Sequence, residues 1–111
     1  MNRRRRDGAA QALAVGVPAR NEAGRIERCL ESISVAIEVV ALPVVVVVCA
    51  DSCTDETAAV ATTVLRGGPA AAFAVEAADL GSAGAARYRA CQRAIQLGTE
   101  VADVDTAQVW V

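Results

Sequence analysis

Histidine is absent from this chain of 111 residues, and aromatic residues make up only 3% of it. Without histidine, the chain cannot form a Ser-His-Asp or Cys-His nucleophile arrangement. Because 54% of the residues are nevertheless hydrophobic, alanine, valine and leucine must fill the core of a packed globular fold. The length supports one small domain.

Cysteine is too sparse to indicate a metal centre or a disulfide framework. Of the four cysteines, Cys49 and Cys53 are separated by three residues, but neither a second pair nor a histidine accompanies them. A zinc site is therefore weakly supported, and we expect reduced thiols in the core. For Cys53 alone, the alternative is an exposed, oxidisable thiol in a loop.

Long apolar runs are also missing, and positive charge is confined to one end. The longest apolar stretch, residues 39–50, is interrupted by Pro43 and falls short of the roughly 20 residues that a membrane helix needs. No apolar signal-peptide core follows the N-terminal arginines, so we expect a cytoplasmic protein with, at most, peripheral membrane contact. Four arginines and one aspartate give residues 1–7 a charge of +3. Because the net charge of the whole chain is −2, residues 8–111 carry a charge of −5. Residues 1–11 are expected to form a basic flexible tail, and the acidic body disfavours nucleic acid as a partner.

Apolar segments alternate between strand and helix patterns. A β-branched run over residues 44–50 shows no alternation, which predicts a strand buried on both faces. Ile26, Leu30, Ile33 and Ile37 recur at helical spacing and predict a helix whose apolar stripe lies on the sheet. The predicted strands cover residues 12–17, 44–50, 71–75 and the segment from 109 onwards, and the predicted helices cover residues 24–37, 55–65 and 85–97, with Gly98 as a stop. This order predicts an α/β fold with a mostly parallel sheet in the order three-two-one-four.

Polar clusters follow the first two predicted strands, at residues 18–22 (Pro-Ala-Arg-Asn-Glu) and 51–57 (Asp-Ser-Cys-Thr-Asp-Glu-Thr). Open α/β sheets bind ligands at the carboxyl ends of their strands, so the two clusters can converge on one ligand. Asp51 can accept a hydrogen bond from a nucleobase N–H, or it can cap the following turn. Glu22 can accept hydrogen bonds from ribose hydroxyls, or it can interact with a helix dipole. Asp55 and Thr57 suit capping and loop closure at the start of a helix.

A third polar segment, residues 81–87 (Gly-Ser-Ala-Gly-Ala-Ala-Arg), opens the third predicted helix. Its backbone N–H groups and Arg87 could face a diphosphate, and the alternative is a glycine-rich helix entry with a surface arginine. Neither a GxGxxG fingerprint after the first strand nor a Walker loop is present, which argues against dinucleotide oxidoreductases and P-loop NTPases.

From about Val15 to Val111 the chain resembles glycosyltransferase family 2. The two strand-end clusters match that family's Pro-Ala-Arg-Asn-Glu and Asp-Asp-Gly-Ser-Thr-Asp-Gly-Thr motifs, and residues 81–87 match its third, Gly-x-Gly-x-Ala-Arg-Asn-like segment. The chain departs from these motifs at Ala50, Ser52, Glu56 and Tyr88. The resemblance implies a Rossmann-like GT-A half over residues 12–111, truncated at the fourth strand. It implies a nucleotide-binding set of Pro18, Ala19, Glu22, Asp51, Gly84 and Arg87.

The implied function is binding of a UDP- or GDP-linked sugar, as the donor-binding fragment of an enzyme that transfers the sugar to an acceptor hydroxyl. In this family an Asp-x-Asp motif after the fourth strand holds a divalent cation, Mn²⁺ or Mg²⁺. Asp103 and Asp105 precede Val109 and are predicted to lie in the loop that leads to that strand, so we expect this fragment to hold no metal and to carry no catalytic residue. The alternative is a non-catalytic nucleotide-binding or assembly module, whose exposed sheet edge associates with a partner.

Overall fold

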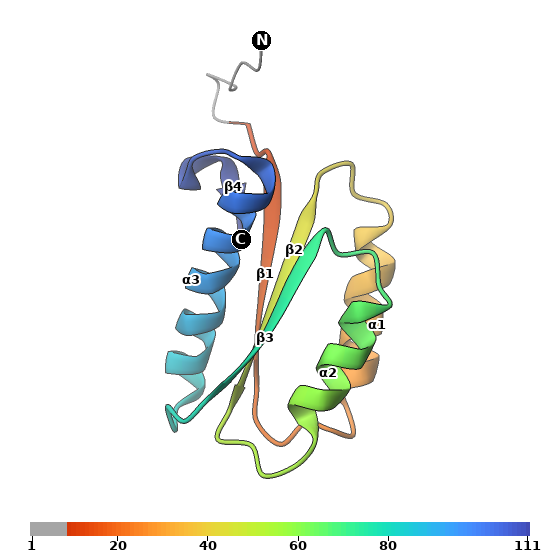
Figure 1. Ribbon diagram of the computed structural model, residues 1–111, viewed down its shortest axis with the longest axis vertical. Helices are drawn as coiled ribbons and strands as arrows, with labels where there is room; N and C mark the ends of the chain where they lie inside the picture. The colour runs from red at the N-terminus through yellow and green to blue at the C-terminus, as the bar shows by residue number, and fades with distance from the viewer. Residues whose placement is uncertain (1–8) are drawn as a thin grey trace.

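The computed structural model describes residues 9–111, so residues 1–8, with most of the expected basic tail, lie outside the described residues. The fold is a four-stranded parallel sheet in the order β3-β2-β1-β4, which confirms the predicted topology. Helix α3 covers one face of the sheet, and α1 and α2 cover the other (Figure 1). The strands are β1 (Ala12–Ala19), β2 (Val44–Asp51), β3 (Ala72–Ala78) and β4 (Val109–Trp110); the helices are α1 (Ile26–Ile37), α2 (Thr57–Arg66), α3 (Ala83–Ala102) and the short 3-10 helix η1 (Thr106–Gln108).

Strand β2 is the centre of the core, and all eight of its residues are buried. Val44, Val46 and Val48 belong to the apolar cluster under α1 and α2. Val45 and Val47 belong to the cluster under α3, because successive side chains of a strand point to opposite faces. The prediction of a strand buried on both faces is therefore confirmed.

Helix α1 places its predicted apolar stripe on the sheet. Ile26, Leu30 and Ile37 are buried, and Ile33 packs against them. The helix begins at Ile26, two residues later than predicted, because the N–H groups of Arg25 and Ile26 both donate to the carbonyl of Glu22 in a preceding turn.

Strand β3 and helix α3 both extend past their predicted ends. Strand β3 continues past Val75 to Ala78, because the charge of Glu76 is matched by Arg93, whose Nε lies 2.9 Å from the Glu76 carboxylate. Helix α3 continues past Gly98 to Ala102. Gly98 therefore does not end the helix. A Cβ at this position would lie 2.7 Å from Cγ1 of Val109, so the absence of a side chain allows β4 to approach the helix.

Strand β1 is also longer than predicted and includes Pro18. The N–H of Leu13 donates to the carbonyl of Pro43, towards β2. Strand alternation therefore turns the nitrogen of Pro18 towards the opposite side, where a donor is not needed. Among the described residues, β4 covers that side of β1 only at Ala12 and Leu13. None of the helices in the described part of the chain is long and apolar enough to cross a membrane.

Candidate functional site

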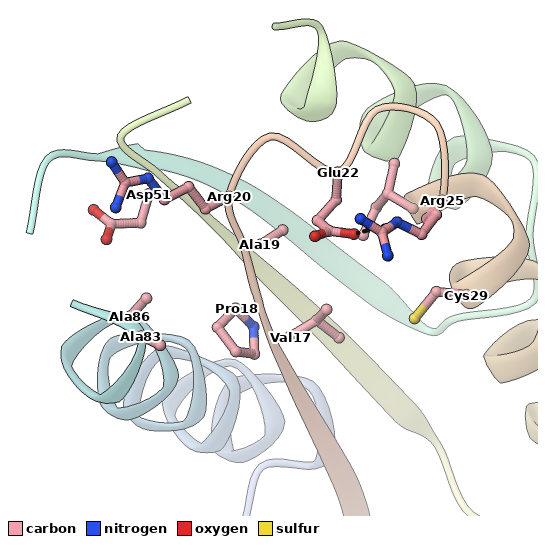
Figure 2. Close-up of a pocket in the computed structure, with 11 residues that line it drawn as sticks. Val17, Pro18, Ala19, Arg20, Glu22, Arg25, Cys29, Asp51, Ala83 and Ala86 are labelled. Carbon is pink, nitrogen blue, oxygen red and sulfur yellow. Dashed lines mark ion pairs between the residues drawn. The ribbon is translucent and has the colours of Figure 1, made fainter. Parts of the chain in front are cut away.

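A cavity of about 390 Å³ opens at the carboxyl end of β1, between α1 and α3. Its volume lies within the range of about 300 to 1,000 Å³ that is typical of small-molecule sites. Helix α1 leaves β1 on one face of the sheet, whereas α3 leads to β4 from the other face, so the cavity lies at the topological switch point of the sheet. The lining residues, drawn in Figure 2, are Val17, Pro18, Ala19, Arg20, Glu22, Arg25, Ile26, Cys29, Asp51, Ala83 and Ala86.

The structure brings together the site residues that were predicted from the two strand ends, and not those from the third loop. Pro18, Ala19, Glu22 and Asp51 line the cavity. Gly84 and Arg87 do not line it, and both are exposed. Ala83 and Ala86 are the α3 residues that face the cavity instead, so the helix presents a small apolar surface there.

Three lining residues with polar or reactive side chains had no role in the sequence prediction, namely Arg20, Arg25 and Cys29. Arg20 lies inside the first strand-end cluster. Arg25 and Cys29 follow Glu22 by three and seven residues, a spacing that places side chains on one face of a helix. That spacing was the signal that could have identified them.

Side-chain hydrogen bonds hold the loop after β1 against the loop after β2. The N–H of Glu22 donates to Oγ1 of Thr57 at 2.8 Å, and the hydroxyl of Thr57 donates to Oδ1 of Asp55. The other carboxylate oxygen of Asp55 accepts from the N–H of Ala23 at 3.2 Å. These bonds, the one from the Thr57 hydroxyl first, lower the pKa of Asp55 and keep it ionised. The predicted role of Asp55 and Thr57 in closing the loop is confirmed.

Asn21 adds further hydrogen bonds between the loop after β1 and the loop after β2. Its Oδ1 accepts from the N–H of Thr54 at 2.8 Å, and its own N–H donates to Sγ of Cys53 at 3.3 Å. Asn21 adopts a left-handed conformation, with φ of 51°, which asparagine tolerates better than most residues. The backbone next to Glu22 is thereby held against the loop after β2.

The carboxylate of Asp51 is engaged with a third loop, the one between β3 and α3. Asp51 is only 2% exposed. Its Oδ1 accepts from the N–H groups of Leu80 and Gly81, and its Oδ2 accepts from the N–H of Ser82 at 3.3 Å. The bond from Leu80, followed by those from Gly81 and Ser82, lowers the pKa of Asp51 although burial opposes the shift. The Asp51 carboxylate therefore binds the backbone of a loop far along the chain, and not the turn that directly follows it.

Glu22 presents its carboxylate at the cavity, beside Arg25. The Oε2 atom of Glu22 lies 3.3 Å from Nε of Arg25, with the side chains 37% and 83% exposed. The dashed line in Figure 2 marks this ion pair. A pair this exposed contributes little to stability. It leaves a lone pair of the carboxylate available to hydroxyl donors.

The thiols are distributed differently from the prediction. All four cysteines are free; Cys49 is buried, but Cys29 is exposed on α1, where it lines the cavity. Burial raises the pKa of the Cys49 thiol, and the charge of Asp51 adds to the effect. The expectation of core thiols thus holds for Cys49 and is wrong for Cys29.

Candidate metal ligands are dispersed over the described residues. Within residues 9–111, no three or more acidic or cysteine side chains are grouped so that they could hold a metal ion. Asp103 ends α3 in a left-handed conformation, and Asp105 precedes η1. Both lie in the loop that leads to β4, as predicted.

Comparisons with known proteins identify the family. No curated protein and no solved structure matches the chain significantly. A family model described as "Glycosyltransferase like family 2" matches residues 10–111, a range that contains the whole sheet and every residue of the cavity. The chain therefore belongs to the glycosyltransferase-like family 2.

Proposed function

We propose that this chain binds the nucleoside diphosphate of a UDP- or GDP-linked sugar, and that the full-length protein transfers the sugar to an acceptor hydroxyl. The observation that carries the proposal is the position of Pro18, Ala19 and Glu22, from the motif at the carboxyl end of β1, around one cavity of suitable size. Membership of the family supports the same conclusion. The proposal includes the cytoplasmic location expected from the sequence.

The cavity has an apolar floor between two polar flanks, one with Glu22 and Arg25 and the other with Arg20 and Asp51 (Figure 2). Val17, Pro18 and Ala19 form a floor on which a flat base can lie, and Glu22 stands beside it as an acceptor for the ribose hydroxyls. The loop contacts of Asn21, Asp55 and Thr57 hold Glu22 in place before a ligand arrives, which lowers the cost of ordering the site on binding.

Isothermal titration of the purified chain with UDP and GDP tests the proposal. Because no three or more acidic or cysteine side chains of residues 9–111 are grouped to hold a metal ion, we expect binding that does not require Mn²⁺. Glu22→Gln should weaken binding about ten-fold, since glutamine keeps an acceptor oxygen but a neutral hydrogen bond contributes roughly 1.4 kcal/mol less than one to a charged group.

The matched control is Glu27→Gln, which makes the same change at an exposed position in the first turn of α1, away from the cavity. The affinity of this variant for UDP and GDP should equal that of the wild type. A folded wild-type chain that binds neither nucleotide would contradict the proposal, and so would an equal loss in the two variants.

The uncovered side of β1 favours a second candidate function, an assembly module. Among the described residues, β1 extends to Ala19 but pairs with β4 only at Ala12 and Leu13, so the strand edge is open beside the cavity. Sedimentation velocity distinguishes the two candidates. Concentration-dependent association without nucleotide binding would favour the assembly module, whereas a nucleotide-binding monomer would exclude it.

A further inference from the structure

We propose that Arg20 binds the diphosphate of the nucleotide in this cavity, in place of Arg87, the arginine that the sequence motif implies. This inference rests on the proposed function, because it assumes that the cavity takes a nucleotide. It goes further by naming the side chain that compensates the charge of the phosphates.

The loop between β3 and α3, which the motif assigns to the diphosphate, uses its backbone donors internally. The N–H groups of residues 80–82 all donate to the carboxylate of Asp51. This carboxylate also places a negative charge against the loop, and like charges repel strongly where water is excluded. Gly84 and Arg87 do not line the cavity. The charge of a diphosphate therefore has to be compensated from another part of the cavity.

Two arginines line the cavity, and they differ in their partners. Nε of Arg25 lies 3.3 Å from Oε2 of Glu22, which compensates the charge of this guanidinium. Arg20 is exposed, lines the cavity, and has no hydrogen-bond or ion-pair partner within residues 9–111. A guanidinium presents its N–H donors in a planar fork that matches the oxygens of a phosphate. Arg20 thus offers both the charge and the donors that a diphosphate needs.

The positions of Arg20 and Glu22 suit the two sides of a ribose that carries phosphates. In Figure 2 these residues lie on opposite flanks of the cavity, with Ala19 between them. The two free hydroxyls of a ribose and the carbon that carries the phosphates project from opposite faces of its ring. When the hydroxyls face Glu22, the diphosphate is therefore directed away from it, toward the flank of Arg20. Asp51 shares this flank but is only 2% exposed, so the flank presents the cation to a ligand more fully than the acid.

Isothermal titration with uridine, UDP, guanosine and GDP separates the contact with the phosphates from the contact with the nucleoside. For whichever base the site accepts, the wild-type chain should bind the diphosphate at least about ten-fold more tightly than the nucleoside, since a hydrogen bond between charged groups contributes that much. Arg20→Gln should lose about ten-fold in affinity for that diphosphate and keep its affinity for the nucleoside. Arg28→Gln is the matched control and should behave as the wild type, because it removes the same charge from an exposed arginine of α1 outside the cavity.

Each other outcome overturns the assignment in a recognisable way. An equal loss for nucleoside and diphosphate in Arg20→Gln would show that Arg20 contacts the base or the ribose. An equal loss in Arg20→Gln and Arg28→Gln would show an effect of net charge alone. An unchanged affinity of Arg20→Gln for the diphosphate would refute the contact, and a loss in Arg87→Gln would then assign it to the loop between β3 and α3.

Two results for the wild type separate this assignment from the proposed function. Equal affinity for nucleoside and diphosphate would refute a contact with the phosphates but leave the proposed function standing. No binding of any of the four ligands by the folded chain would refute the proposed function, and this assignment with it.

Discussion

Gly16→Ala should destabilise the fold by about 2 kcal/mol, because α3 lies too close to β1 for a side chain at this position. An added Cβ would lie 2.8 Å from N of Cys91 and 2.9 Å from C of Ala90. Both are backbone atoms of α3, so they cannot rotate away and the helix must move. Overpacking costs about 1 to 3 kcal/mol. Replacing a strand glycine with alanine returns about 0.5 to 1 kcal/mol. Two contacts with backbone place the cost at the upper end of its range, which gives the net value.

Urea unfolding followed by far-UV circular dichroism measures this loss. With a slope of about 1 to 3 kcal/mol per molar urea, the midpoint should fall by roughly 1 M. Gly24→Ala is the control, because nothing lies within 4 Å of its added Cβ. Its stability should stay within about 0.5 kcal/mol of the wild type.

Gly98→Ala sharpens the comparison. Its added Cβ would meet Cγ1 of Val109 at 2.7 Å, but this neighbour is a side chain that can change rotamer. Alanine also gains about 1 kcal/mol over glycine inside a helix. We therefore expect Gly98→Ala to cost less than Gly16→Ala. A Gly16→Ala variant as stable as the wild type, or a Gly98→Ala variant that loses more, would refute the close packing of α3 on β1.

Two further predictions concern Asp51 and Cys29. The pKa of Asp51 is lowered in the folded state, so its ionised carboxylate stabilises the fold at pH values above the ordinary aspartate pKa of about 3.9, and this contribution is lost as the pH falls through the lower folded pKa. Asp51→Asn should therefore be less stable than the wild type at neutral pH and should approach the stability of the wild type under acid conditions. A difference in urea midpoints that does not depend on pH would contradict this prediction. Alkylation by iodoacetamide should be fast at Cys29, which is exposed in the cavity, and slow at Cys49, which is buried. Saturating nucleotide should slow the reaction of Cys29 alone, and an unchanged rate would contradict a nucleotide in the cavity.

Local patterns were sufficient to predict the sheet and its order. The burial of the uninterrupted valines of β2 and of the spaced isoleucines of α1 can be predicted from the sequence alone, because each pattern is typical of its element. The extensions of β3 and α3 depend on distant partners. The sequence predicts that the strand ends before Glu76, because the partner of Glu76, Arg93 of α3, is known only from the structure. It predicts a helix stop at Gly98, because the packing of Val109 on this glycine is likewise known only from the structure.

The sequence predicted that the ends of β1 and β2 lie at one cavity, but not the contacts that their side chains make there. Asp51 lies where the sequence placed it, yet its partners, the N–H groups of Leu80, Gly81 and Ser82, come from a loop about thirty residues away. Arg87 was assigned to the site by its motif. Whether a residue in a helix faces a cavity depends on the rotation of that helix about its axis, which the packing of Ala86 and Ala90 on Cys49 decides here.

The acidic residues near the cavity show why matching a motif did not reveal these roles. A carboxylate ion offers about four acceptor positions, and an N–H group buried without an acceptor costs about 1 to 3 kcal/mol. Asp51 and Asp55 each accept hydrogen bonds from backbone N–H groups of neighbouring loops, and these bonds are present without a ligand. The Glu22 carboxylate does not hold a loop in this way, because it is paired only with the side chain of an exposed arginine. The acid that remains free to bind a ligand is therefore the one that the loops do not need, and this distinction exists only once the loops have folded together.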